Sequence, residues 1–333
     1  MAVNNFDSIK FQVPLKYLSS ISSNFFDRTL RTREKIVTIT DKNILNTNSD
    51  GLKNIIIDNT QENCTIEISA KILYDNYFSL INKKTISEVF YNLKKLKIIK
   101  FKDYDLLNNS KVLKIDVTRN IPVQSSVKEY VTNLSIVPIA SKFSVTRYKD
   151  ESLVITKNPL SRREKLRCIF YNKMSELLKD KSFCKNYSVL PFDNILRFEI
   201  NFMKFNLIRK HFNINNMESL TLQKLLDSDV NISSNYFDEI KNSFTGNKKV
   251  YDLITNYKTL HDAEKFHGMY GISESFNFDF ILVSRYIRNM VKGNVSNYLR
   301  QYEEICSSGL NKIYKNSNSS KYVDEISNYL KVA

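Results

Sequence analysis

The sequence predicts an α+β fold, in which an N-terminal antiparallel sheet is followed by a mainly helical C-terminal region. Short strand-like runs dominate residues 8–205, only two stretches of helical spacing interrupt them, and the spacing becomes helical after about residue 206. At 333 residues the chain is long enough for two domains. We expect residues 1–210 to form the α+β domain and residues 211–333 to form the helical region.

The first part contains eight runs in which apolar and polar side chains alternate, as they do in half-buried strands. These runs are Ser8–Val13, Ile55–Asp58, Thr65–Ala70, Lys111–Thr118, Lys142–Arg147, Ser152–Thr156, Lys165–Lys173 and Ile195–Lys204. Apolar residues at helical spacing predict helices over Ile86–Leu96 and Val127–Leu134. Strands that far outnumber the helices between them favour an antiparallel sheet.

The last third of the chain predicts helices. Asn213–Asp238 indicates short helices with Ser219 or Thr221 as N-cap, and Tyr314–Ala333 indicates a final amphipathic helix. Ser284–Lys292 and Ser296–Ile305 predict two helices around a glycine turn. The basic residues of this pair could meet DNA phosphates, as in a helix-turn-helix, but we favour an ordinary solvated helix pair that caps the sheet domain. They are Arg285, Arg288, Lys292 and Arg300.

Composition excludes several classes of protein. No glycine-rich phosphate-binding motif is present, so a Rossmann or P-loop nucleotide site is not expected. We expect no membrane span, because no run of 18 apolar residues occurs, and no signal peptide, because the N-terminus lacks a long apolar segment. The four cysteines, none in a CxxC pair, favour reduced thiols in a cytoplasm.

The charge balance favours a polyanionic partner. Fifty Lys and Arg against 35 Asp and Glu give a net charge of +15. An AT-rich genome, whose codons enrich lysine, explains part of this excess. It does not explain why residues 141–211 alone carry sixteen basic and seven acidic residues. Nucleic acid is therefore the expected ligand.

The polar residues of four predicted strands point to chemistry on one face of the sheet. If Thr65–Ala70, Lys111–Thr118, Lys165–Lys173 and Ile195–Lys204 share a sheet, their polar sets lie together. This face would hold Glu67, Asp116 and Glu199, with Glu176 just past a strand end, beside Arg167, Tyr171, Lys173 and Arg197. Clustered carboxylates suit a hard divalent cation, and a tyrosine beside a metal-bound phosphate suits in-line attack.

Simpler interpretations of this face remain. Antiparallel sheets often expose one face to solvent, and alternating polar residues then indicate only that exposure. Lys173 and Glu176, three residues apart, could form only an ion pair at a helix start. On the pattern alone, a solvated face is the favoured explanation.

Six segments, in this order, resemble the gene II/X family of phage and plasmid replication initiators. They are FDSIKFQVPL, TIEISAKILYDNYF, KIDVTRN, ESLVITKN, CIFYNKMSEL and ILRFEINF. The resemblance covers roughly residues 6–212 and implies an RRM/palm-like nicking domain. One departure is Tyr74-Asp75-Asn76, which stands where the family often has a GHN-like turn.

The resemblance implies rolling-circle DNA replication. A member nicks one strand of a double-stranded origin with a tyrosine, forms a 5′-phosphotyrosine adduct, leaves a free 3′-OH and later joins the strand. Carried over by position, Tyr171 is the nucleophile and Lys173 its catalytic partner. Glu67, Asp116, Glu176 and Glu199 would hold the metal. No histidine lies before residue 211, so a carboxylate-held Mg²⁺ or Mn²⁺ is expected.

The expected ligands follow from the same resemblance. Arg162, Arg163, Arg167 and Arg197 are the candidate DNA-binding residues, although Arg162 and Arg163 could equally well only solvate a turn. The partners would be double-stranded and single-stranded origin DNA, with helicase and polymerase of a bacterial host, in its cytoplasm. An inactive origin- or operator-binding protein and a basic packaging protein are the alternatives. Clustered acids favour the enzyme, because they weaken phosphate binding unless a metal lies between them.

Overall fold

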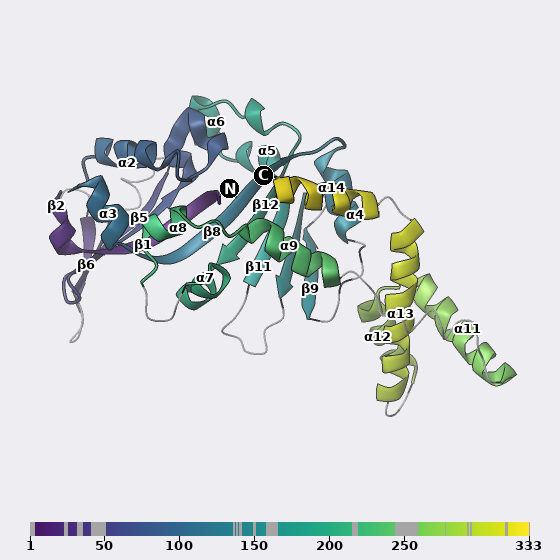
Figure 1. Cartoon of the computed structure of the whole chain (residues 1–333). Helices are drawn as coiled ribbons and strands as arrows, with labels where there is room; N and C mark the ends of the chain where they lie inside the picture. Colours follow the sequence, from purple (N-terminus) through teal and green to yellow (C-terminus); the bar gives the residue numbers. More distant parts are fainter. Residues whose placement is uncertain are drawn as a thin grey trace.

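The computed structural model describes the chain over residues 4–22, 26–31, 36–40, 51–135, 137, 139, 142–148, 151–157, 166–214, 219–243, 259–276, 278–291, 293, 295–316 and 319–332. Within these residues the fold is α+β, with a large antiparallel sheet in the N-terminal part and helices dominating the C-terminal part (Figure 1). The predicted fold class is therefore confirmed.

The described strands form one ten-stranded sheet, in the order β3-β4-β5-β6-β1-β8-β12-β11-β10-β9, and a two-stranded sheet of β2 and β7. All the pairings are antiparallel. The strands are β1 Phe6–Pro14, β2 Leu18–Ile21, β3 Phe26–Arg31, β4 Ile36–Thr40, β5 Leu52–Asp58, β6 Asn63–Ser69, β7 Ile99–Phe101, β8 Lys111–Pro122, β9 Phe143–Tyr148, β10 Ser152–Lys157, β11 Leu166–Asn172 and β12 Ile195–Phe202.

The helices lie between and after these strands. Three are 3₁₀ helices: η1 Leu15–Tyr17, η3 Ala70–Ser79 and η4 Leu190–Phe192. The α-helices are α2 Ile86–Lys95, α3 Asp103–Asn109, α4 Val127–Ser135, α5 Lys173–Leu177, α6 Lys181–Asn186, α7 Phe205–His211, α8 Leu222–Leu226, α9 Ile232–Ser243, α11 Leu260–Ser275, α12 Phe280–Met290, α13 Ser296–Asn316 and α14 Ser319–Val332. Among the described helices, none has the length and apolar character that a membrane crossing requires.

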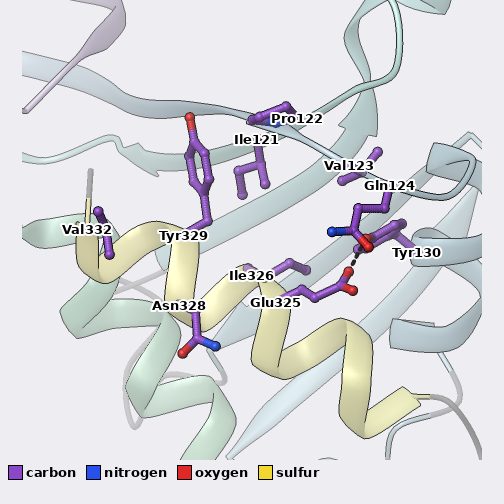
Figure 2. Close-up of a pocket in the computed structure, with 10 residues that line it drawn as sticks. All are labelled: Ile121, Pro122, Val123, Gln124, Tyr130, Glu325, Ile326, Asn328, Tyr329 and Val332. Atoms are coloured by element: carbon purple, nitrogen blue, oxygen red, sulfur yellow. Dashed lines mark hydrogen bonds between the residues drawn. The ribbon is translucent and has the colours of Figure 1, made fainter.

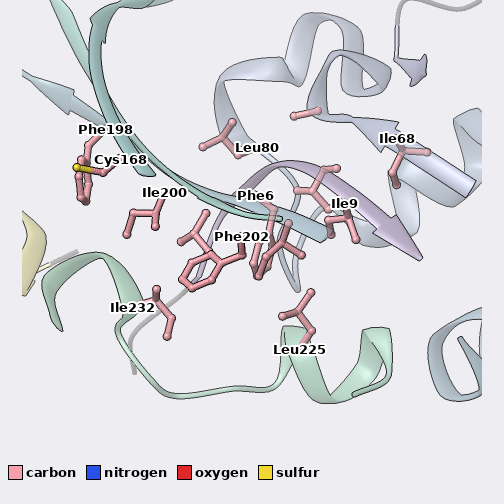
Figure 3. Packing of buried hydrophobic residues seen from close by; sticks show 14 of the residues in the cluster. Phe6, Ile9, Ile68, Leu80, Cys168, Phe198, Ile200, Phe202, Leu225 and Ile232 are labelled. Carbon is pink, nitrogen blue, oxygen red and sulfur yellow. The ribbon is translucent and has the colours of Figure 1, made fainter. Parts of the chain in front are cut away.

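The apolar face of the sheet carries the main hydrophobic core. Phe170 of β11 stacks on Phe198 of β12 with ring centroids 4.7 Å apart, and Phe237 of α9 meets both rings edge-on. Helices α4, α9 and α14 pack over this face, and Figure 3 shows part of the cluster. Burial of these rings removes a large apolar area from water, which is the main stabilising contribution to such a layered fold.

The polar face is covered over only part of its area. Tyr77 of η3 and Phe192 of η4 pack on one another above Arg197 of β12. Phe183 of α6 meets Tyr77 edge-on from the side. These short helices bury the end of the sheet where β11 runs into α5.

The helices after residue 210 belong to two hydrophobic clusters. Helices α8, α9 and α14 share the core of the sheet, whereas α11, α12 and α13 enclose a separate cluster around Val283, Ile287 and Cys306. Figure 1 shows the α11–α13 group standing away from the sheet, with α14 returning to it. Three helices that follow the boundary expected at residue 210 therefore share a hydrophobic core with the sheet that precedes it.

Two local details differ from the expected strands. The pairing of β1 with β8 shifts register between Lys10↔Lys114 and Phe11↔Val112, so Val112 is buried and Leu113 is only half-buried. This bulge interrupts the alternation expected along the predicted strand Lys111–Thr118. The strand expected to reach Lys173 ends at Asn172, whose side chain accepts a hydrogen bond of 3.0 Å from the backbone N–H of Ser175 and so caps α5.

Candidate active site

The strand register brings the predicted polar sets together. Residues directly opposite each other in an antiparallel sheet point to the same face. Tyr171 of β11 lies opposite Arg197 of β12, and Asn201 of β12 lies opposite Asp116 of β8. Strand β1 lies between β8 and β6, the strand of Glu67. The polar sets therefore share one face, as the alternation predicts, with β1 inserted among them.

The Tyr171 hydroxyl and the Glu199 carboxylate form the centre of this face. Tyr171 Oη donates a hydrogen bond of 3.0 Å to Glu199 Oε2. Burial and the charges of Asp7 and Asp116 raise the pKa of Glu199 to about 7. Burial and the Glu199 charge hold the pKa of Tyr171 well above its usual value near 10. The phenol thus keeps its proton at neutral pH, beside a carboxylate that can accept it.

Asn201 links this carboxylate to a second one. Its Nδ2 donates to Glu199 Oε1 at 2.7 Å and to Asp116 Oδ1 at 2.9 Å. The Ser8 hydroxyl donates to the other oxygen of Asp116, and Arg167 donates twice to Asn201 Oδ1 at 3.1 Å. The alternation places Asn201 on this face, but no sequence signal gives it a role. Two carboxylates are thereby fixed side by side.

Arg197 is fully buried in this layer. Its Nη1 donates to Asp7 Oδ1 at 2.7 Å and to Tyr77 Oη at 3.2 Å, and its Nε donates to Asn120 Oδ1 at 2.9 Å. A guanidinium with no exposed surface does not reach DNA, so the expectation that Arg197 binds a phosphate directly is wrong. Arg197 instead supplies a fixed positive charge next to Tyr171. Asp7 and Tyr77 were not predicted, because their partner is distant in sequence.

Lys173 supplies a second buried cation. Its side chain is 2% exposed, and its Nζ lies 5.6 Å from the centre of the Tyr171 ring and 5.3 Å from that of Tyr77. Burial and the neighbouring Arg197 lower the pKa of Lys173. The ammonium donates to Glu176, whose side chain is 48% exposed. The ion pair at spacing i, i+3 that the sequence left open therefore forms.

Glu67 lies at the lysine-rich end of the face. Lys10 Nζ and Lys114 Nζ each lie 3.4 Å from one of its carboxylate oxygens. Burial alone would raise the pKa of Glu67, but these lysines and Lys53 hold it below its ordinary value. Lys114 Nζ also lies 4.0 Å from Asp116. Glu67 thus neutralises lysines, and two strands, β1 and β8, lie between its strand and that of Glu199.

The structure does not gather the four predicted metal ligands into one site. Across the described ranges, no three His, Cys, Asp or Glu side chains form a group that could hold a metal. Glu176 pairs with Lys173, and Glu67 pairs with lysines. Asp116 and Glu199 remain as a bridged pair. Two carboxylates fit the way Mg²⁺ is usually held, with substrate phosphate and water completing its ligands.

The other candidate DNA-binding residues differ in whether the structure describes them and in where they lie. Arg167 is exposed and anchored on Asn201 at the open side of the face. Arg162 and Arg163 lie outside the described residues. On the C-terminal helices, Arg285 and Arg288 lie on the exposed side of α12, opposite its buried Val283 and Ile287. Lys292 also falls outside the described residues, and Arg300 is exposed on α13.

A cavity of about 420 Å³ lies elsewhere, between the end of β8 and helix α14 (Figure 2). Tyr130 donates a hydrogen bond to Glu325 at its wall. Tyr130 also meets Tyr322 edge-on with ring centroids 4.5 Å apart, which ties α4 to α14. None of the predicted site residues lines this cavity, so it belongs to helix docking and not to the Tyr171 site.

Comparison with known proteins adds no family assignment. No protein-family model matches the chain, and no curated protein matches it.

Proposed function

We propose that this chain is a tyrosine-dependent, divalent-metal-dependent DNA nicking and joining enzyme that initiates rolling-circle replication. The observation that carries the proposal is the hydrogen bond of 3.0 Å from Tyr171 to Glu199, beside the buried Lys173. A nucleophile paired with a base, and next to fixed positive charge, is the arrangement that covalent catalysis requires. Simple DNA binding requires neither the base nor the buried cation.

The proposed reaction begins at the Tyr171 oxygen. Glu199 takes the phenol proton as Tyr171 Oη attacks the phosphorus of a phosphodiester. A new bond joins Oη to the 5′ phosphate, and the bond to the 3′ oxygen breaks. The 3′ oxygen leaves with that electron pair and takes a proton from water, which gives a free 3′-OH. Attack of a 3′-OH on the phosphotyrosine reverses these steps and joins the strand.

The buried cations support the charge that develops during this attack. Lys173 and Arg197 both lie next to Tyr171, Lys173 against its ring and Arg197 directly opposite it in the strand register. Arg197 is held by Asp7, Tyr77 and Asn120, and Lys173 is buried and paired with Glu176, so they need little reorganisation as negative charge appears on the phenolate and the phosphate. Preorganised charge of this kind is usually a large term in catalysis.

Asp116 and Glu199, joined by Asn201, are the residues that would hold Mg²⁺ or Mn²⁺. A bound divalent cation would polarise the phosphoryl group and offset the charge on its oxygens. The chain's own part is to fix the two carboxylates through Asn201 and Ser8. Glu67 and Glu176 are left out of this set, because each already neutralises a lysine.

The proposal extends to the ligands. The substrate would be double-stranded origin DNA, and the strand displaced after nicking would be single-stranded. Helicase and polymerase of a bacterial host would be the protein partners, in the host cytoplasm. The net charge of +15 supports a DNA partner. An inactive DNA-binding relative is the alternative, and it would keep the affinity for DNA without any covalent product.

The test is covalent capture. The chain is incubated with Mg²⁺ and 3′-end-labelled DNA fragments that tile the replicon encoding it, and the products are separated on a denaturing gel. Attack on the 5′ phosphate leaves the labelled 3′ segment attached to the protein. We expect a labelled protein band with one fragment, and no band with Tyr171→Phe. Binding of DNA without any labelled band would favour the inactive alternative.

A further inference from the structure

Part of the polar face is not covered by any element in the described part of the chain. On β9, Ser144, Thr146 and Tyr148 are exposed. On β10 and β11, Val154 and Ile169 are half-buried and Arg167 is exposed. We call this area, together with Lys10 and Lys114, the uncovered face. It borders the Tyr171 site, because Arg167, Ile169 and Tyr171 alternate along the same side of β11.

Tyr148 is the aromatic residue of the uncovered face. Its side chain is 58% exposed, on edge strand β9. Tyr148 lies opposite Ser152, and Ser152 lies opposite Tyr171, so the two tyrosines share one row on the same face. Two strand spacings separate them, which is about 10 Å. An exposed ring at that distance can stack on a base close to the phosphate that Tyr171 attacks.

The opposite side of the uncovered face is basic. Lys10 and Lys114 are 30% and 23% exposed and flank Glu67, and Lys53 adds a third positive charge there. Three lysines around one carboxylate leave a positive excess. Lys114 lies 4.0 Å from Asp116, which Asn201 joins to Glu199. The basic end is therefore contiguous with the Tyr171 site.

We propose that the uncovered face is a binding path for single-stranded DNA, with phosphates on Lys10 and Lys114 and an unpaired base stacked on Tyr148. The inference rests on the proposed function, since it assumes that Tyr171 attacks DNA. A DNA strand that crosses β1, β8, β12, β11, β10 and β9 in this order would pass Tyr171 about midway between the two lysines and Tyr148.

Single-stranded DNA fits this face better than duplex does. An exposed ring gains stacking energy only from a base whose face is free, and in a duplex each base face is occupied by its neighbour. The half-buried Val154 and Ile169 likewise offer apolar contact to bases and not to phosphates. Cations at one end and an aromatic ring at the other are the usual elements of single-strand recognition.

The test measures binding of a fluorescent 20-mer of thymidylate by anisotropy in EDTA, with Tyr171→Phe in every variant to prevent cleavage. Adding Tyr148→Ala should weaken binding roughly five- to hundredfold, the range that loss of one stacked base gives. Tyr148→Phe, which keeps the ring, should bind like its parent. Tyr104→Ala is the matched control, because Tyr104 is 73% exposed on α3, outside the sheet.

The lysines are tested by the salt dependence of the same affinity. Lys10→Gln with Lys114→Gln should make the log–log salt slope shallower by about 1.4, at roughly 0.7 per lost single-strand phosphate contact. The control pair, Lys84→Gln with Lys100→Gln, removes two exposed charges away from this face and should leave the slope unchanged. Equal thermal unfolding of all variants excludes a folding defect.

The outcomes separate the inference from the proposed function. Unchanged affinity for Tyr148→Ala, or an unchanged slope for the lysine pair, overturns the path even where the wild-type chain forms its covalent adduct. Equal competition by duplex DNA, or stronger competition by a uridylate 20-mer, overturns the single-stranded DNA assignment. If the Tyr148 and lysine variants bind as expected but the wild-type chain forms no adduct, the nicking activity is refuted and the binding path for single-stranded DNA is still supported.

Discussion

The hydrogen bond of 3.0 Å from Tyr171 Oη to Glu199 Oε2 joins the proposed nucleophile to a buried carboxyl whose pKa is raised to about 7. The two side chains come from neighbouring strands, β11 and β12, and Glu199 lies two residues beyond Arg197, the residue directly opposite Tyr171. Because both strands are anchored in the core through Phe170 and Phe198, the pair is held without depending on loops.

Tyr171→Phe removes one oxygen and should abolish nicking while leaving folding and DNA affinity nearly unchanged. The phenylalanine keeps the ring that lies against Lys173. Tyr187→Phe is the matched control, because Tyr187 stacks on Tyr74 and lies between α6 and η4, outside the strands of the Tyr171 site. Nicking rate and thermal unfolding are measured for both. Wild-type nicking by Tyr171→Phe together with loss in Tyr187→Phe would move the nucleophile to Tyr187.

Glu199→Gln should lower the nicking rate roughly 10²–10⁴-fold, the usual contribution of a general base. In the wild-type chain the rate should rise with pH to an inflection and then level off, because Glu199 must be unprotonated to accept the phenol proton, and a cation held by Glu199 would move this inflection below pH 7. The variant should lose this inflection. Single-turnover rates from pH 5 to 9 measure both, and an inflection that persists in Glu199→Gln would assign it to another group.

The same carboxyl should make stability depend on pH. Glu199 has a pKa of about 7 in the folded chain against 4.5 for an ordinary glutamate, so the folded state holds its proton more tightly. Its contribution to the free energy of unfolding is therefore greatest below pH 4.5 and falls as pH rises to 7, by on the order of 3 kcal/mol. Urea unfolding at pH 5 and pH 8 should show this loss in wild type relative to Glu199→Gln. A difference between the two chains that does not change with pH would contradict it.

Asp116→Asn keeps the shape of the side chain and removes its charge, so it should raise the Mg²⁺ concentration required for nicking or abolish nicking. DNA affinity in EDTA should hold or rise, because one negative charge fewer faces the phosphates. Glu176→Gln is the control, since the half-exposed Glu176 pairs with Lys173 and lies outside the bridged carboxylates. Undiminished cleavage in EDTA by the wild-type chain would refute the metal requirement.

Arg197→Met should destabilise the fold by about 3–5 kcal/mol, because it leaves the mostly buried Asp7 carboxylate without its partner. The double variant with Asp7→Asn should lose clearly less stability than the two single losses added together. Chemical unfolding of the four chains in this cycle gives the coupling. Additive losses would show that the pair is not coupled.

The sequence could predict the face but not the contacts on it. Alternation along Thr65–Ala70 and Ile195–Lys204 fixes which side chains point together, since the period of a strand is two. It does not fix which strands are neighbours. Strand β1 separates β6 from β8, and this places Lys10 beside Glu67 and turns an expected metal ligand into a member of an ion-pair cluster.

Other residues were missed for reasons of distance and local geometry. Asp7 and Tyr77 reach Arg197 across 190 and 120 residues of sequence, and no local pattern marks such a contact. The bulge at Leu113 shifts the alternation because one residue of β8 has no partner in β1. Helix α14 was predicted as a helix, but its return to the core of the sheet depends on long-range packing.

The measurement that tests the central claim most directly is the mass of the modified peptide. The covalent adduct is digested with nuclease and trypsin, which releases Cys168–Lys173, a peptide whose only tyrosine is Tyr171. The account predicts that this peptide carries the added mass of a 5′-nucleotide on Tyr171. A nucleotide on Asn186–Arg197, which contains Tyr187, or on any other peptide would contradict it.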